Sequence, residues 1–150
     1  MEALEKLLSD KDSYIAECQE RLENEDVLAQ LKETRLQAEI SLENLMAEIQ
    51  ELVHENARKS QNQQKYRAKF NKLVQQIDEQ KKHIADLKAK ELKTVGMREK
   101  LHRFIETLEN YQDVTVFKEQ QWNNLIESVV VNPDSLYFEF KNGEKIKISI

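Results

Sequence analysis

The residues that most often perform chemistry are scattered along this sequence. His54, His83 and His102 lie far apart and Cys18 is the only cysteine, so no local ligand set exists for a metal ion. Two lone glycines cannot form a phosphate-binding loop. The many acidic residues lie on solvated helix surfaces, where no pocket shifts a pKa towards catalysis. We expect no catalytic, cofactor-binding or metal-binding residue, no small-molecule substrate and no enzyme activity.

The compartment follows from the same residues. A single cysteine cannot form an internal disulfide, which suits a reducing environment, and Cys18 fits a small apolar position on a helix face. The N-terminus is acidic and does not have the pattern of a secretory signal, and no apolar run reaches the roughly 18 residues of a membrane span. We expect an intracellular protein of the nucleus or cytoplasm with no membrane span.

The scarcity of turn residues predicts a long helix. The 150 residues are 34% charged and 39% hydrophobic, with only 2 Gly and 1 Pro. Turns usually recruit Gly, Pro, Asn or Asp. We therefore predict a mainly α protein in which residues 1–95 are nearly uninterrupted helix, with a coiled coil over residues 1–110.

One heptad register accounts for most apolar positions of this helix. Starting at Leu42 as position a, the alternating spacing of three and four residues keeps its phase to Leu108. An N-terminal stripe, formed by Leu4, Leu8, Ile15, Cys18 and Leu22, joins it after a slip of one residue. The predicted dimer seam consists of Leu42, Leu45, Ile49, Leu52, Asn56, Phe70, Leu73, Ile77, Ile84, Leu87, Leu101, Ile105 and Leu108.

The residues in and beside the seam suggest the partner. Isoleucine at a with leucine at d favours two parallel strands, and Asn56 at an a site would penalise other registers, unless it only marks a loose stretch. The flanking e and g positions contain no acid: they are Asn62, Arg67, Lys69, Val74, Gln76, Lys81, His83, Lys88, Lys90 and Val95. An identical parallel chain would face like charges, so we expect a heterotypic coiled-coil partner with acidic e and g positions.

A fold-back within the chain is the alternative. Residues 1–56 carry 15 acidic and 5 basic side chains, whereas residues 57–103 carry 5 acidic and 14 basic ones. The two blocks could pair as an antiparallel hairpin, or as an antiparallel dimer, with residues 56–64 as the turn. These residues include neither Gly nor Pro and are good helix formers, which favours the continuous helix. The weak points are residues 23–28, 56–64 and 94–97, where Gly96 predicts a kink or short loop.

Residues 111–150 have the pattern of a small α+β module with a C-terminal β-hairpin. Val114–Phe117 predicts a strand, residues 118–127 one or two helical turns, and residues 128–131 another strand before a turn at 132–135. Apolar residues alternate in 136–140 and 146–150, and matching the two rows requires a three-residue loop, 141–143, with Gly143 left-handed. The predicted core or partner face consists of Trp122, Leu136, Phe138, Phe140, Ile146 and Ile148. Because about 40 residues bury little core, we expect a partner, or further chain, to complete this module.

This order of elements resembles the coiled-coil-plus-RWD subunits of eukaryotic kinetochores and their checkpoint and monopolin relatives. The matching features are the helix end at Leu101–Leu108, the segment Val114–Phe117, and the strands DSLYFEF (134–140) and KIKISI (145–150). The later strands and C-terminal helix of that fold have no counterpart here. The resemblance implies an obligate heterodimer that acts as a spacer or hub in chromosome segregation.

We therefore predict a structural subunit that dimerises through a coiled coil and presents its C-terminal module to protein partners. A cytoskeletal or vesicle-tethering adaptor would share the features of the rod. The basic segment 58–103 could instead bind nucleic acid or acidic microtubule tails. Because its aromatic residues, Tyr66 and Phe70, lie in the seam, no base-stacking platform is interleaved with the charge, and binding to nucleic acid is not expected.

Overall fold

The protein is mainly helical and ends in a small antiparallel sheet. The computed structural model describes residues 2–24, 26–60, 62–111, 116 and 118–150. In chain order, its elements are α1 (Glu2–Ser9), α2 (Lys11–Glu23), α3 (Asp26–Arg58), α4 (Gln63–Glu109), α5 (Glu119–Leu125), β1 (Ile126–Asn132), β2 (Ser135–Phe140) and β3 (Lys145–Ser149). The chain forms two compact units: the hairpin unit, residues 26–94, and the terminal unit, residues 1–25 with 95–150.

The prediction of nearly continuous helix over residues 1–95 is wrong. The helix is interrupted between α1 and α2, again between Glu23 and Asp26, and again between Arg58 and Gln63. The last two interruptions lie within the predicted weak points. At the third interruption, the side-chain oxygen of Asn62 accepts hydrogen bonds from the backbone N–H groups of Gln64 and Lys65, at 3.0 and 3.2 Å. Asparagine is among the best N-caps, so it starts a new helix without help from Gly or Pro.

Helix α4 passes through Gly96 as one element, so no loop forms where a kink or loop was predicted. An interior glycine costs a helix about 1 kcal/mol relative to alanine. A helix of 47 residues tolerates this cost because the hydrogen-bond ladder on either side is long.

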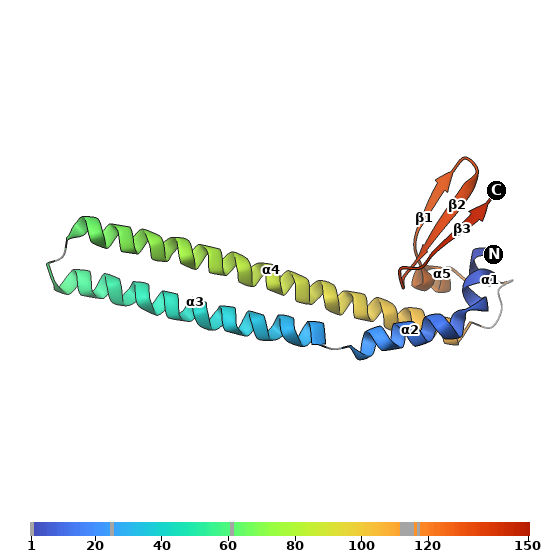
Figure 1. The fold of residues 1–150 in the computed structure, drawn as a ribbon, viewed down its shortest axis with the longest axis horizontal. Coiled ribbons are helices and arrows are strands. Elements are labelled where there is room, and N and C mark those ends of the chain that lie inside the picture. Colours follow the sequence, from blue (N-terminus) through green and yellow to red (C-terminus); the bar gives the residue numbers. More distant parts are fainter. Residues whose placement is uncertain (1, 25, 61, 112–115, 117) are drawn as a thin grey trace. The chain divides into compact units, whose positions relative to one another are not determined.

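In the hairpin unit, α3 and the first part of α4 run antiparallel to each other (Figure 1). Ala38, Ile84 and Leu87 are buried between the two helices, with Leu31 and Leu42 packed against them. The fold-back considered as the alternative is therefore the arrangement that this unit adopts, and the acidic and basic blocks of the sequence pair within one chain.

The terminal unit has one core to which both ends of the chain contribute. Phe104 and Leu108 from α4, Leu125 from α5 and Phe140 from β2 are 0–1% exposed, and Leu7 from α1 is equally buried. The buried members are Ala3, Leu4, Leu7, Cys18, Leu22, Leu101, Phe104, Ile105, Leu108, Leu125, Ile126 and Phe140. Residues of α1, α2 and the end of α4 thus share a core with the C-terminal module. Completion of this module by a partner or further chain remains a prediction.

The sheet has the order β1-β2-β3, and both of its pairings are antiparallel. Leu136 pairs with Ile148 and Phe138 with Ile146, as predicted from the alternation of apolar residues. Gly143 has φ +90°, and its N–H donates to the carbonyl of Phe140 at 2.9 Å, which confirms the predicted left-handed position. The helical turns and the strand predicted after residue 118 are confirmed as α5 and β1.

One predicted strand falls mostly on residues that the structure does not describe. The segment Val114–Phe117 lies outside the described residues except for Val116, which is in a bend.

Candidate protein-interaction surfaces

Across the described residues, no three His, Cys, Asp or Glu side chains gather in a way that could hold a metal ion. None of the helices, over the residues described, is both long enough and apolar enough to cross a bilayer. The surfaces of the two units are therefore the candidates for function.

The predicted seam residues divide between two cores. Those from Leu42 to Leu87 are buried or half-buried along the facing sides of α3 and α4, within the hairpin unit. Leu101, Ile105 and Leu108 belong to the core of the terminal unit. One heptad phase thus serves two different packing partners, both from the same chain. Parallel pairing with another chain remains a prediction.

Asn56 lies at the turn of the hairpin unit. Its side-chain oxygen accepts a hydrogen bond from the amide of Gln63 at 3.1 Å. The polar residues that interrupt the seam therefore belong to the connection between α3 and α4. This agrees with the interpretation of Asn56 as a mark of a loose stretch, because a satisfied amide beside a turn does not specify a dimer register.

Opposite charges face each other across the hairpin unit. Helix α3 carries 7 acidic and 3 basic residues, and residues 63–94 of α4 carry 9 basic and 4 acidic ones. Arg35 donates from Nε to Glu91 at 2.6 Å and from Nη1 to Glu39 at 3.1 Å. These hydrogen bonds, Glu91 first, raise the pKa of the Arg35 guanidinium. Among the basic e and g positions of α4, Lys88 lies 3.9 Å from an acid of α3, Glu39. An acidic coiled-coil partner from another chain remains a prediction.

The flanks of this hairpin differ in chemistry. In an antiparallel pair, e positions of one helix lie beside e positions of the other, and g positions lie beside g positions. The Lys88 ammonium is 3.9 Å from a carboxylate oxygen of Glu39, and both residues are at e positions. The antiparallel arrangement thus creates one flank of e residues and another of g residues.

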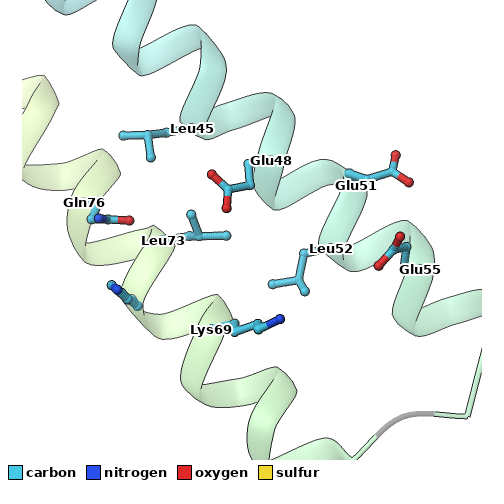
Figure 2. Close-up of a pocket in the computed structure, with 9 residues that line it drawn as sticks. Leu45, Glu48, Glu51, Leu52, Glu55, Lys69, Leu73 and Gln76 are labelled. Atoms are coloured by element: carbon cyan, nitrogen blue, oxygen red, sulfur yellow. The ribbon is translucent and has the colours of Figure 1, made fainter.

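The flank of g residues, which we call the charged flank, contains a groove between α3 and α4. Its volume is about 530 Å³, and its lining residues are Leu45, Glu48, Glu51, Leu52, Glu55, Lys69, Lys72, Leu73 and Gln76. Figure 2 shows Leu45, Leu52 and Leu73 in the space between the helices, with Glu51 directed away from it. The rim is acidic along α3 and basic along α4, as expected for two helices that attract each other.

The apolar flank consists of Met46, Val53 and Val74, all at e positions. These side chains are 43%, 44% and 37% exposed. Nearer the other end of α3, the same flank is closed by the ion pair between Glu39 and Lys88. The exposed apolar e positions are therefore confined to the half of the hairpin unit next to its turn, although Leu36, Ile40 and Leu92 are also exposed elsewhere on this unit. Large exposed apolar side chains gathered on one side indicate an interface.

Among the described residues, no strand pairs with the outer side of β1. We call this side of the sheet the open edge. Val129, Val130 and Val131 are 37%, 54% and 72% exposed, although β1 pairs with β2 along its other side. No charged residue lies between Glu127 and Asp134. Soluble proteins usually protect such edges with lysine, proline or a bulge, because unpaired backbone groups recruit other strands. In β1 the register is irregular between Ile126 and Ser128, before the exposed valines.

A small cavity is lined by residues of β1, β2 and β3. Its volume is about 220 Å³, and its lining residues are Ser128, Val130, Tyr137, Phe138, Glu139 and Lys145. Binding sites for drug-sized molecules are about 300–1,000 Å³. The cavity is smaller than that and has room for a single side chain.

The predicted module residues mostly support the core and leave little surface for a partner. Phe140 is fully buried, and Leu136, Phe138, Ile146 and Ile148 are half-buried. Trp122 lies edge to face with Phe138, with ring centroids 6.1 Å apart. The valines of β1 were predicted to form a strand, but their place at a sheet edge depends on the strand order, which local sequence does not specify.

Charged contacts hold the module to the end of α4. The Glu127 carboxylate lies 2.9 Å from the ammonium of Lys141 and 3.3 Å from that of Lys100. The hydrogen bond from Lys141 is the largest effect and holds the pKa of Glu127 below its usual value; burial opposes it, and the hydrogen bond from Lys100 adds to it. Asn124 of α5 also donates to the Thr107 hydroxyl at 3.2 Å.

Comparisons with protein-family models, with curated proteins and with solved structures found no match to this chain. Function therefore has to be argued from the surfaces described above.

Proposed function

We propose that this protein is a non-enzymatic interaction subunit that holds a partner protein at the open edge of its sheet. The observation that carries the proposal is the exposure of Val129, Val130 and Val131 on an uncharged edge strand. A partner segment in extended conformation would add a fourth strand through backbone hydrogen bonds. The cavity beside Val130 and Tyr137 would accept one of its side chains.

The rest of the chain suits a support for this edge. The core of the terminal unit fixes β1 from the side of β2, because Ile126 and Phe140 are paired and both buried. The hairpin unit would act as a spacer, since α3 has 33 residues and a helix rises about 1.5 Å per residue.

A photo-crosslinking amino acid at position 130 tests the proposal. We expect it to capture a protein in cells, whereas the same group at Leu92, which is 75% exposed, should not. The captured protein would then be purified and bound to the chain. We expect amide exchange of residues 128–131 to slow on binding, and Val131→Lys to weaken binding at least tenfold while Leu92→Lys leaves it unchanged.

Two results would contradict the proposal. One is equal capture from positions 130 and 92. The other is binding of the purified partner without any added protection of the β1 amides, which would place the partner elsewhere on the chain.

We further propose chromosome segregation as the setting, on the support of the resemblance to kinetochore subunits. A fluorescently tagged chain is then expected at centromeres of dividing cells. Cytoplasmic puncta or filaments would favour the vesicle-tethering or cytoskeletal adaptor instead.

A further inference from the structure

We propose that two copies of this chain associate through their apolar flanks, so that two hairpin units form a four-helix bundle near their turns. This goes beyond the proposed function, because it concerns a different unit and a partner of the same sequence. It starts from Met46, Val53 and Val74, which remain exposed although α3 and α4 already cover each other's seam.

The seam beneath the apolar flank is incompletely covered. Leu73, Ile84 and Leu87 are buried, whereas Ile49, Phe70 and Ile77 are only half-buried. Two helices alone cover a seam only partly, and a helix within a bundle usually adds e or g positions to its apolar face. The half of the hairpin unit near its turn has this wider apolar face on the e side only.

The charges beside the apolar flank indicate which kind of partner would cover it. On the apolar flank near the turn, α3 carries the acid Glu43, and α4 carries the bases Arg67 and Lys81 together with the acid Asp78. An entirely acidic partner would fit α4 and be repelled by α3, and an entirely basic one would have the reverse problem. A partner with acidic and basic residues at the same separation would complement both helices. A second copy of this chain has such residues.

Charge also selects the orientation. If the twofold axis runs parallel to the helices, α3 of each copy lies on α4 of the other, and all neighbouring helices are antiparallel with opposite charge. If the axis is perpendicular to the helices, within the interface, α3 lies on α3 and acid faces acid. Like charges brought together at an interface cost free energy, so the parallel axis is favoured.

Glu43 and Lys81 are the pair that this orientation brings together between copies. Glu43 is at a b position and Lys81 at an e position, both on the side of the apolar flank, and both are exposed. In the described part of the chain, neither forms an ion pair. Their levels along the hairpin match, because Glu39 faces Lys88 and the groove places Leu52 near Lys69.

Light scattering of the purified full-length chain is the first test. We expect the wild type to have twice the 17.8 kDa of one chain at about 50 µM, a concentration at which weak transient dimers are populated. Met46→Lys should return the mass to that of one chain with unchanged helical circular dichroism. Val27→Lys is the matched control, because Val27 is 54% exposed on α3 but at a g position, and it should remain dimeric.

Mixing two charge variants is the second test and does not depend on altering an apolar residue. Glu43→Lys and Lys81→Glu should each dissociate at least tenfold more readily than the wild type. Mixed in equal amounts, they should recover the dimer, because each interface contact then joins opposite charges. A contact within one chain could not be restored by mixing.

A wild-type chain that stays monomeric would overturn the proposal and leave the apolar flank to a different protein. Equal dissociation by Met46→Lys and Val27→Lys, or no recovery on mixing, would overturn it as well.

Discussion

Replacing Leu7 with alanine tests whether the N-terminal helix packs as the structure shows or as part of one continuous coiled coil. The N-terminal apolar stripe places Leu4 and Leu8 on a seam and leaves Leu7 outside it. In the structure, Leu7 is 0% exposed in the core that contains Phe140, and Leu8 is only half-buried. The two descriptions therefore predict opposite orders for the cost of Leu7→Ala and Leu8→Ala.

The magnitude follows from burial. Truncating a fully buried leucine to alanine costs about 2–5 kcal/mol, because apolar transfer free energy is lost and a cavity remains. Leu7 packs among side chains from distant parts of the chain, so neighbours cannot readily collapse into the space. We expect about 3 kcal/mol for Leu7→Ala and less than about 1.5 kcal/mol for Leu8→Ala.

Trp122 provides the assay. It is the only tryptophan and it packs against the core of the terminal unit, so its fluorescence follows unfolding of that unit. A loss of 1 kcal/mol lowers the melting temperature of a small domain by about 4–8 °C, so Leu7→Ala should lower the Trp122 transition by about 12–24 °C. Circular dichroism of the same samples reports the helices of both units.

The reasoning is refuted if the Trp122 transition is unmoved by Leu7→Ala while total helix falls, because α1 would then fray without support from the sheet. It is also refuted if Leu8→Ala costs more than Leu7→Ala, which is the order that the seam periodicity requires.

Three further predictions concern single groups. Gly143→Ala should destabilise the terminal unit by about 1 kcal/mol, because φ at this position is +90°. Gly96→Ala should instead stabilise helix α4 by about 0.5–1 kcal/mol. Neither added methyl group meets an atom within 4 Å, and urea titration measures both changes in the free energy of unfolding. Lys141 lowers the pKa of Glu127 in the folded chain. The stabilisation by the Glu127 carboxylate is therefore complete above the unfolded pKa, near 4.5, and is lost as the pH falls through the lower folded pKa. Glu127→Gln should reduce the fall of the free energy of unfolding at acid pH. Burial raises the pKa of the Cys18 thiol, so alkylation at pH 8 should be slow and should accelerate in parallel with the tryptophan signal as urea is added; rapid alkylation of the folded chain would contradict the described burial.

The β-hairpin could be predicted in detail because its determinants are local. Alternation in residues 136–140 and 146–150 fixes which side chains share a face, and only a loop with Gly143 left-handed aligns the two rows. The short helix α5 and the strand β1 that follows it were also predicted from a change in apolar period. In each of these elements, neighbours in sequence are neighbours in space.

The core of the terminal unit could not be predicted in the same way. Leu7 and Phe140 meet across almost the whole chain, and nothing in the spacing of either segment names the other. Phe104 is at a g position beside the seam, so periodicity alone leaves it outside the core, yet it is 0% exposed. The apolar face of α4 is wider in this segment because it packs against several elements, and that width is visible in the sequence only as Phe104 next to Ile105.

The fold-back of α3 onto α4 shows what charge patterns can and cannot specify. Basic e and g positions on α4 predict an acidic partner, and that requirement is met equally by another chain or by α3. The choice depends on the connection, residues 59–62. A short connection holds the two helices at an effective concentration of about a millimolar or more, so pairing within the chain outcompetes an external helix present at micromolar concentration. External partners must then use surfaces that the fold-back leaves uncovered, which is why the apolar flank and the open edge, and not the seam, are the places where association is to be sought.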